Sequence, residues 1–264
     1  MAAITGHDAF ADLARYYDAV MAPVDYDHWL LVTRSLAELL PSKNFRHLDA
    51  ACGTGRLLKH LRQHGWSSCG VDLSPAMLAA GRQDPYAAPA AAADMRALPF
   101  RGCFDYVTCL FDSLNYLLTL EDVSRALREI RGVLKDGGIF YFDVVTERMV
   151  TDHYEGQKWT EDNGGFTTTW SSVYNRKTNL SETTIRVGTE LATTICQRMY
   201  DVADVSSAAE NAGFDVLAAV DAETWKAPTT KTVRVEFAAV CGATREVRRR
   251  FEDIRKRLEE LCAG

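Results

Sequence analysis

The chain has 264 residues, a formal net charge of −6, 47% hydrophobic and 25% charged residues. This composition excludes a disordered or collagen-like chain, and the acidic balance disfavours a protein that grips nucleic-acid phosphates, which need a basic surface. No uncharged apolar run reaches the roughly 18 residues of a membrane helix, and residues 1–18 lack the basic and apolar regions of a secretory signal. We therefore expect neither a nucleic-acid nor a membrane partner.

The number and spacing of the cysteines and histidines indicate the cellular compartment and whether a metal site is expected. Seven cysteines are scattered along the chain without a CxxC pair. An odd, scattered set is typical of reduced thiols and predicts a cytoplasmic protein. The cysteines and the six histidines do not combine at zinc-ligand spacing, so we predict no metal site.

Residues 45–145 alternate short apolar runs with helical patterns, which predicts parallel strands joined by helices. The first strand ends in the glycine turn of LDAACGTG, and Ser74 with Pro75 starts a later helix. A Gly137-Gly138 turn precedes the apolar run IFYFDVV. Strands are expected at 45–50, 67–72, 104–111 and 139–145, a short Ala-rich strand ending at Asp94, and helices at 56–64, 75–82 and 121–134.

The pattern changes after Glu147. Residues 167–174 and 180–190, rich in Thr, Val and Trp around the turn NRKTN, predict an antiparallel hairpin that 191–200 extends. A helix over 204–212 and strands over 215–224 and 232–242 follow. The tail 245–261 is an amphipathic helix, whose apolar stripe packs on its own domain or forms a homodimer contact. The stripe consists of Val247, Phe251, Ile254, Leu258 and Leu261.

The glycine turn carries the first chemical signal. Glycine permits positive φ and lets a ligand approach the backbone, and the first strand-to-helix turn of an open parallel sheet is where ligands bind. A pyrophosphate fingerprint would continue as GxGxxG, but Leu58 stands at the third glycine position. Asp49, just before Gly53 and Gly55, would repel a pyrophosphate and attract an ammonium group. The turn therefore favours a zwitterionic ligand over a dinucleotide, and a packing turn without ligand is the alternative.

Two further carboxylates suit a nucleoside. Asp72 ends the next strand, where a carboxylate accepts hydrogen bonds from both ribose hydroxyls. Asp94 can accept from an adenine amino group, with Met95 beside the ring. The alternatives are a helix-capping acid at Asp72 and a solvated loop acid at Asp94.

The segments LDAACGTG, GVDLSPAML, ADMRALPF, FDYVTCLFDSLNYL and DGGIFYFDVV resemble the ordered motifs of class I S-adenosylmethionine-dependent methyltransferases. The resemblance spans roughly residues 16–145. It implies an α/β fold with a doubly wound, mostly parallel, seven-stranded Rossmann-like sheet and an antiparallel β insertion after the fifth strand. It also implies S-adenosylmethionine as cofactor and S-adenosylhomocysteine as product.

The resemblance assigns roles by position. The turn from Asp49 to Gly55 would hold the methionine end of the cofactor, Asp72 the ribose, and Asp94 the adenine amino group. The segment from Leu110 to Asn115 would border the sulfonium and the substrate. The implied cofactor-binding residues are Tyr16, Asp49, Ala51, Gly53, Gly55, Asp72, Leu73, Met77, Asp94, Met95, Leu110 and Phe111.

The opening ARYYDAVMAPVDYDHW, the FDSLNYL segment and the late insertion are similar to small-molecule methyltransferases of the glycine N-methyltransferase-like and amino-sugar N-methyltransferase-like group. There the YYD segment closes over the cofactor, so Tyr16 or Tyr17 would be a lid residue. The implied organisation is an N-terminal helical lid (1–44), a cofactor-binding domain (45–146 and 200–242), a substrate cap (147–199) and a C-terminal helix (243–264).

Methyl transfer from a sulfonium is an in-line displacement, for which the enzyme chiefly aligns the nucleophile. A base is needed only if the nucleophile is protonated. The candidate catalytic residues are Tyr17, Asp112 and Asn115, with helix capping as the alternative role of Asp112. We expect a small-molecule acceptor, with nitrogen favoured over oxygen. The alternatives are an RNA or protein methyltransferase, a non-catalytic cofactor-binding protein and a nicotinamide oxidoreductase.

Overall fold

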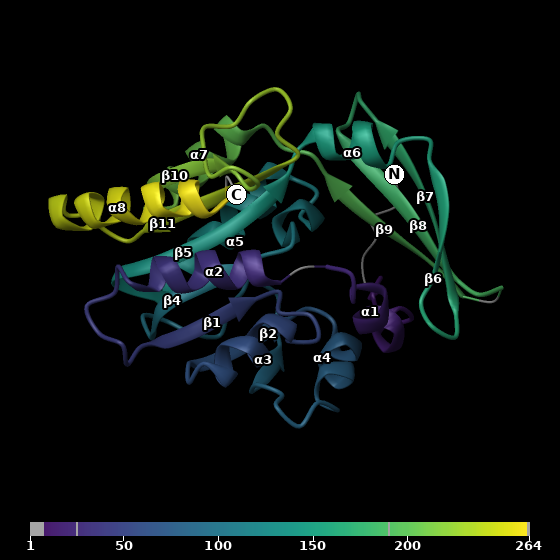
Figure 1. The fold of residues 1–264 in the computed structure, drawn as a ribbon, viewed down its shortest axis with the longest axis horizontal. Helices are drawn as coiled ribbons and strands as arrows, with labels where there is room; N and C mark the ends of the chain where they lie inside the picture. The colour runs from purple at the N-terminus through teal and green to yellow at the C-terminus, as the bar shows by residue number, and fades with distance from the viewer. Residues whose placement is uncertain (1–7, 25, 190, 263–264) are drawn as a thin grey trace.

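Two β-sheets organise the molecule in a computed structural model, which describes residues 8–24, 26–189 and 191–262. The larger sheet has seven strands, and a four-stranded sheet stands beside it (Figure 1). The seven strands are β1 (Arg46–Ala50), β2 (Ser67–Asp72), β3 (Ala90–Ala92), β4 (Phe104–Cys109), β5 (Leu134–Val145), β10 (Asp215–Asp221) and β11 (Arg234–Val240).

The order in the larger sheet is β10-β11-β5-β4-β1-β2-β3. Strand β11 runs antiparallel to both neighbours, and the other paired strands are parallel. The chain reverses its direction of winding at β1, which lies between β4 and β2. Ligands of doubly wound sheets bind beyond the carboxyl ends of the strands at such a reversal. The α/β fold and the mostly parallel seven-stranded sheet are confirmed.

Apolar helix stripes cover both faces of this sheet. Val123, Leu127 and Ile130 of α5 (Leu120–Val133) and Val205 of α7 (Val202–Asn211) are fully buried in one core. The opposite core buries α2 (Asp27–Ala37), α3 (Arg56–Gln63) and α8 (Arg245–Cys262). The short helices α1 (Ala14–Val20) and α4 (Pro75–Gly81) lie near the β3 edge (Figure 1). Both faces are covered, as parallel strands require.

The strand β5 begins earlier than expected. The helix ends at Val133, so Leu134 belongs to the strand, where it pairs with Phe104. Gly137 and Gly138 lie inside the strand as an irregularity, because the register slips between the pairs Phe104–Leu134 and Tyr106–Ile139. Gly137 has a φ of 74° and donates its N–H to the carbonyl of Cys241. The glycine pair is therefore a bulge rather than a turn before the strand.

The four-stranded sheet contains the expected hairpin and one strand more. Its order is β6-β7-β8-β9, all antiparallel, with β6 (Lys158–Asp162), β7 (Thr167–Asn175), β8 (Leu180–Val187) and β9 (Leu191–Arg198). Strand β6 and the helix α6 (Glu147–His153) were not expected. The segment KWTED carries three charged residues, and this edge strand has mostly exposed side chains, so its alternation is weak. The late antiparallel insertion itself is confirmed.

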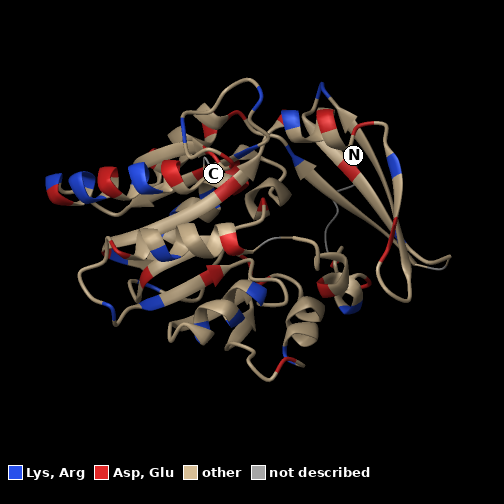
Figure 2. Ribbon diagram, in the orientation of Figure 1, with Lys and Arg blue, Asp and Glu red and all other residues tan. Residues whose placement is uncertain are grey.

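The C-terminal helix buries most of its apolar stripe against the rest of the chain. Phe251, Ile254 and Leu258 are buried against α2 and the sheet, whereas Leu261 is 55% exposed. Lys and Arg alternate with Asp and Glu along α8 (Figure 2). The stripe therefore packs on its own domain. Among the described residues, no helix is long and apolar enough to cross a membrane.

Helix α2 is fastened to the sheet by a buried carboxylate. His28 Nε2 lies 2.6 Å from Glu236 Oε1, and the indole of Trp225 donates to Glu236 Oε2 at 2.8 Å. Glu236 and Trp225 are both fully buried. The next residue on α2, Trp29, stacks on Phe111 with ring centroids 4.2 Å apart. The contacts of His28 and Trp29 thus hold α2 against the segment that follows β4.

Candidate active site

A cavity of about 470 Å³ lies at the carboxyl ends of β1, β2, β3 and β4. The N-terminal segment before α1, the turn after β4 and strand β9 of the smaller sheet complete its walls. The sequence-predicted residues that line it are Tyr17, Asp49, Ala51, Gly53, Asp72, Leu73, Met77, Asp94, Met95, Leu110 and Phe111. One cavity therefore gathers side chains from four strand ends.

The glycine turn forms the floor of the cavity with an unusual backbone. Ala51 has a φ of 62° and Gly53 a φ of 57°. A non-glycine residue in the left-handed region costs of order 1 kcal/mol or more and marks functional turns. Helix α4 packs tightly on this turn, since a Cβ on Gly81 would lie 2.0 Å from the carbonyl oxygen of Thr54. The absence of a side chain at Gly81 therefore lets α4 pack directly against the backbone of the turn.

Asp49, at the start of the turn, is a buried acid. It is 4% exposed and accepts a 2.6 Å hydrogen bond from the Thr108 hydroxyl. Burial raises the pKa of Asp49 to about 7, because removal from water penalises the charged form. The neighbouring Asp72 raises it further, and the Thr108 hydrogen bond opposes the shift. A cationic ligand group would find a carboxylate here.

Asp72 is held by backbone donors. Gly53 N–H donates to Oδ2 at 2.7 Å, and Ser74 N–H donates to Oδ1 at 2.8 Å. Ser74, and not Asp72, caps α4 through the N–H of Met77. Burial raises the pKa of Asp72. The carboxylate therefore lines the cavity with both oxygens oriented, and each keeps a free lone pair.

Leu73 presents an apolar surface beside this carboxylate. Its side chain is 67% exposed, which is unusual for a large aliphatic residue, and it lines the cavity. Scattered exposed leucines need no explanation. A leucine facing a cavity next to an oriented acid provides a surface on which a flat apolar ring can lie.

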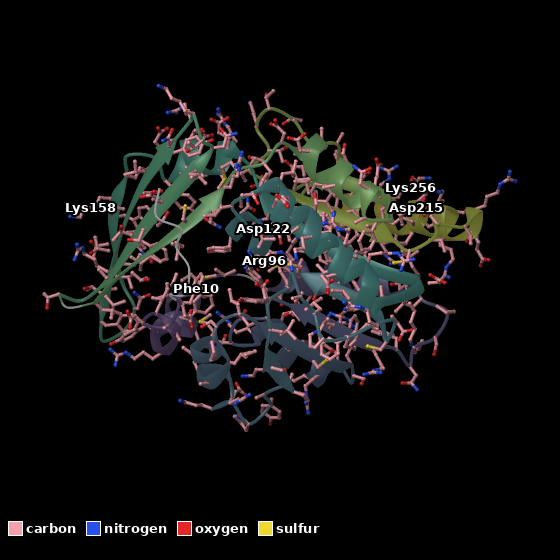
Figure 3. The ribbon with its side chains drawn as sticks, turned by 180° about the vertical axis from the view of Figure 1, so that it is seen from behind. Phe10, Arg96, Asp122, Lys158, Asp215 and Lys256 are labelled. Carbon is pink, nitrogen blue, oxygen red and sulfur yellow. The ribbon has the colours of Figure 1, made fainter. Side chains whose placement is uncertain are left out.

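Asp94 already has a partner. Arg96 reaches it with Nη2 at 2.7 Å from Oδ2 and also lies 3.1 Å from Asp122. The guanidinium lowers the pKa of Asp94. Arg96 and Asp122 line the cavity with Asp94, and Figure 3 shows Arg96 beside Asp122. The sequence reading missed Arg96, because an arginine two residues after an acid carries no motif of its own.

The turn after β4 also has strained backbone. Phe111 and Asp112 have φ values of 58° and 51°. Asp112 makes no capping hydrogen bond to the short 3-10 helix η1 (Ser113–Tyr116) that it precedes. The helix-capping alternative for Asp112 is therefore wrong.

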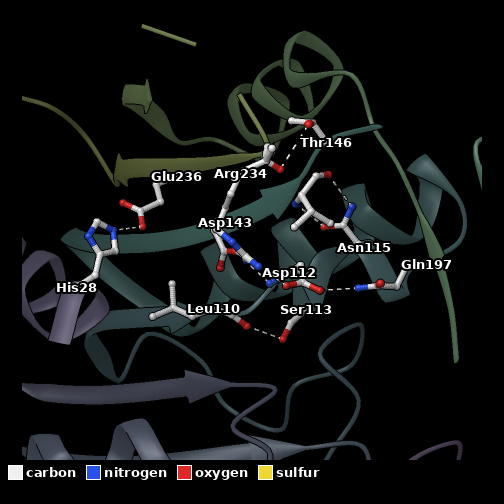
Figure 4. A network of polar contacts seen from close by, with 12 residues as sticks. His28, Leu110, Asp112, Ser113, Asn115, Asp143, Thr146, Gln197, Arg234 and Glu236 are labelled. Carbon is white, nitrogen blue, oxygen red and sulfur yellow. Dashed lines mark hydrogen bonds and ion pairs between the residues drawn. The ribbon is translucent and has the colours of Figure 1, made fainter. Parts of the chain in front are cut away.

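Asp112 instead joins a polar network that reaches three distant segments (Figure 4). Arg234 Nη2 donates to Oδ1 at 2.8 Å and Gln197 Nε2 donates to Oδ2 at 2.5 Å. Arg234 also pairs with the fully buried Asp143, which accepts the Asp112 N–H at 3.0 Å. Burial raises the pKa of Asp143 to about 6. Asp112 is oriented by this network and does not line the described cavity itself.

Asn115 is a structural residue. Its Nδ2 donates to the carbonyls of Val145 at 3.1 Å and Arg198 at 2.8 Å, and its Oδ1 accepts from Val145 N–H at 3.0 Å. The side chain is fully buried. With its hydrogen-bonding groups engaged by backbone, Asn115 joins the end of β5 to the end of β9, and its assignment as a catalytic residue is not kept.

The adjacent tyrosines of α1 diverge. Tyr17 lines the cavity, and burial raises the pKa of its phenol. Tyr16 packs on Phe166 of the smaller sheet, with ring centroids 4.8 Å apart, and is absent from the cavity wall. On a helix, successive side chains point about 100° apart, so only one of the pair faces the cavity. That residue is Tyr17 and not Tyr16, which was expected to contact the cofactor.

Gly55 lies at the edge of the turn. It has a φ of 81° and precedes α3, on the side of the turn that faces an outer groove between α1, α3 and α4. Gly55 shapes the turn and is not among the residues that line the cavity.

The segment before α1 closes over the cavity. Asp8 accepts a 2.5 Å hydrogen bond from Ser74, and the Ala9 carbonyl accepts one from Thr193 of β9 at 2.6 Å. The next residue, Phe10, lines the cavity and lies edge-on to Tyr116, with ring centroids 5.4 Å apart. Residues 1–7 of the expected lid lie outside the described residues. Sequence reasoning missed Phe10, because one aromatic in a short polar segment has no periodicity.

The aromatic residues of the insertion form a stack on the smaller sheet. Tyr154, Trp159 and Trp170 lie in sequence, with centroids 5.6 Å and 5.8 Å apart. Both indole N–H groups donate to Glu161. Trp225, by contrast, lies in the buried core that also holds α2 and α8.

Two histidines at the end of α3 contradict the expectation that no histidines stand at zinc-ligand spacing. His60 in α3 and His64, which follows its last residue, have the i, i+4 spacing of a two-histidine pair. In the part of the chain that the structure describes, no group of three or more His, Cys, Asp or Glu side chains is arranged to hold a metal ion.

Residues 48–154 match a family model described as a methyltransferase domain. A putative methyltransferase of Bacillus subtilis is 33% identical over 167 residues, which cover 62% of this chain and 66% of the relative. A putative methyltransferase of a Geobacillus species is 31% identical, over 61% of this chain and 68% of its own length. The chain thus spans about two thirds of the length of these relatives.

More distant matches have defined names. A dTDP-3-amino-3,4,6-trideoxy-α-D-glucopyranose N,N-dimethyltransferase of Streptomyces venezuelae is 34% identical over 92 residues, covering 35% of this chain and 39% of the relative. The fold is similar to an S-adenosylmethionine-dependent methyltransferase of Clostridium acetobutylicum, with a TM-score of 0.75, 24% identity, 89% of this chain and 100% of that one. It is also similar to an amino pentose methyltransferase of Micromonospora echinaspora, with a TM-score of 0.67 and 22% identity, over 86% and 97%.

Proposed function

The chain belongs to the S-adenosylmethionine-dependent methyltransferases, and from this premise we propose that it methylates the nitrogen of a small-molecule amine. When bound, the cofactor supplies a methyl group on a positively charged sulfur, which an acceptor nitrogen displaces in line. The observation that carries the proposal is the cavity in which Asp49, Asp72 and Asp94 face one ligand-sized volume at the winding reversal of the sheet.

The residues present fit this cofactor. Asp49 is a buried acid that accepts a hydrogen bond from the neutral Thr108 hydroxyl. Its negative charge therefore suits the ammonium group of a methionine moiety. Asp72 keeps free lone pairs for two ribose hydroxyls, and the exposed Leu73 offers a surface for adenine. Arg96 would share Asp94 with the adenine amino group. These roles are proposals for the sequence-predicted cofactor-binding residues.

The acceptor side is proposed around Asp112. Burial, with a smaller contribution from the charge of Asp112, raises the pKa of the Tyr17, Tyr116 and Tyr154 phenols. Their raised pKa values keep the phenols protonated at neutral pH, so they act as hydrogen-bond donors rather than bases. Aromatic and hydroxyl groups around a carboxylate suit an amine.

Asp112 is the proposed catalytic residue. Arg234 and Gln197 fix its two oxygens, so it can orient an amine without changing rotamer. Two carboxylates, Asp112 and Asp143, pair with the one guanidinium of Arg234. This excess of negative charge favours a cationic or hydrogen-bond-donating acceptor. Tyr17, from α1, is proposed to close over the reacting centre. Amino sugars, the substrates named for some relatives, are the first acceptors to test.

Transfer of a labelled methyl group to a panel of amino sugars, simple amines, phenols and alcohols tests this proposal. Turnover with an amine, and formation of S-adenosylhomocysteine in equal amount, is expected. Turnover restricted to phenols or alcohols would overturn the nitrogen assignment. Tight cofactor binding without turnover on any small acceptor would favour a macromolecular acceptor or a non-catalytic binding protein.

A further inference from the structure

A chain of buried hydrogen bonds runs beneath the proposed cofactor site, across three neighbouring strands. Ser68 on β2, His47 on β1 and Thr108 on β4 lead to Asp49, with separations of 3.2 Å, 3.0 Å and 2.6 Å. His47 and Thr108 are fully buried, and Ser68 and Asp49 are at most 7% exposed. Four polar side chains in the middle of a parallel sheet are unexpected, because such strands are usually apolar on both faces.

The hydrogen-bonding capacities fix the direction of this chain. An ionised Asp49 accepts only, so the Thr108 hydroxyl donates to it. Thr108 Oγ1 then accepts from His47, whose Nε2 carries the proton. His47 Nδ1 is left to accept from the Ser68 hydroxyl. Burial lowers the pKa of His47 to about 3, which agrees with this neutral tautomer.

The surroundings of Asp49 make the hydroxyl important. Among the described residues, the titratable groups that are electrostatically coupled to Asp49 are Asp72 and Cys69 from β2, Cys52 from the glycine turn, Cys109 from β4 and Tyr26 before α2. None of these groups carries positive charge. The Thr108 hydroxyl therefore opposes the burial cost that would otherwise protonate the acid.

We propose that Thr108 and His47 are positioning residues for cofactor binding, which hold Asp49 ionised and leave one of its oxygens directed at the ammonium of the cofactor. The proposal rests on the proposed function, because it needs Asp49 to bind that ammonium. Thr108 touches Asp49 and not the cavity, and His47 acts one step further back. Their effect on the ligand is transmitted by the charge and orientation of the acid.

The proposal predicts how affinity depends on pH. A cation binds the ionised acid, so affinity should fall as the pH drops below about 7, where Asp49 takes up a proton. Removing the donor moves this midpoint to higher pH, because the charged form loses a hydrogen bond. A structural role for Thr108 would lower stability and leave the midpoint in place.

The test is the dissociation constant of S-adenosylmethionine, measured by calorimetry between pH 5.5 and 8.5. Thr108→Val should weaken binding at pH 7 by about tenfold, the lower value for a hydrogen bond to a charged group, and raise the midpoint by about one pH unit. Thr108→Ser keeps the hydroxyl and should restore both. Thr232→Val is the matched control, since Thr232 donates to Asp221 at the same 2.6 Å but lies outside the cavity.

The outcomes separate the two claims. If the natural chain and the Thr232→Val variant do not bind S-adenosylmethionine, the proposed function fails. If they bind and folded Thr108→Val binds equally well with an unmoved midpoint, the positioning role is overturned. Should Thr108→Val fail to fold, His47→Leu replaces it: the upward shift is then expected to be smaller but in the same direction, and an unmoved midpoint contradicts the proposal.

Discussion

The cofactor end of the cavity and the proposed acceptor end beyond its wall are built by different means. At the cofactor end, Asp72 is oriented by backbone groups 2 and 19 residues away in the sequence. At the proposed acceptor end, Asp112 is oriented by side chains 85 and 122 residues away, Gln197 and Arg234. The first arrangement is carried by a local motif on one sheet edge. The second exists only after the smaller sheet and β11 have docked, so it can vary without disturbing cofactor binding.

This difference gives the first prediction, which should produce the largest effect. Asp72→Ala removes a carboxylate that would accept two ribose hydroxyls, and hydrogen bonds to a charged group are worth about 1.5–3 kcal/mol each. We expect S-adenosylmethionine affinity to fall by roughly a hundredfold, measured by calorimetry, with the protein still folded. Asp136→Ala, at a 97% exposed side chain, is the control. Unchanged affinity in Asp72→Ala would remove Asp72 from the cofactor site.

The second prediction concerns the junction between the two ends. Asn115→Ala leaves the backbone groups of Val145 and the Arg198 carbonyl without their partner. Unsatisfied buried groups cost about 1–3 kcal/mol each, and three groups lose their partner, so we expect the free energy of unfolding, measured with urea, to fall by about 3 kcal/mol or more. A stable protein that has lost only turnover would instead return Asn115 to the catalytic candidates.

The third prediction sharpens the division of labour. Asp112→Asn keeps the shape of the side chain and removes its charge, so it should lower turnover of an amine acceptor by about tenfold, below the range of roughly 10²–10⁴-fold typical of full general-base catalysis. Cofactor affinity should stay within about twofold of the natural chain. Steady-state kinetics and calorimetry on one preparation give both values. Equal losses in the two would show that the ends of the cavity are not independent.

The fourth and smallest effect is one of stability. Burial gives Asp49 a higher pKa in the folded chain, about 7, than its ordinary value of 3.8. The folded state therefore holds a proton that the unfolded state has lost between these values, and stability falls as the pH rises through this window. Asp49→Asn, which stays neutral, should match the natural chain near pH 3.5, below both values, and be more stable at pH 8 by ~1 kcal/mol or more. Urea unfolding at the two pH values measures this, and a destabilised variant at pH 8 would contradict it.

Most residues of the cofactor end could be predicted from the sequence, but few residues of the acceptor end could. Leu58 at the third glycine position and Asp49 before the turn separated this site from a dinucleotide site, and the strand ends brought Asp49, Asp72 and Asp94 together. Tyr16 and Gly55 do not line the cavity, because spacing in a motif does not say which of two neighbours faces it. The partners of Asp112 and the buried Thr108–His47 pair arise from contacts between distant strands, which no local pattern in the sequence indicates.

Ligand-induced stabilisation tests the central claim, that the cavity binds S-adenosylmethionine, most directly. Thermal unfolding is measured with S-adenosylmethionine, S-adenosylhomocysteine and NAD, each in large excess. A ligand at ~100 times its dissociation constant stabilises by about 2.7 kcal/mol, which is a shift of several degrees for a chain of this size. The account predicts a shift with the first two ligands and none with NAD. A shift with NAD alone, or with none of the three, would contradict it.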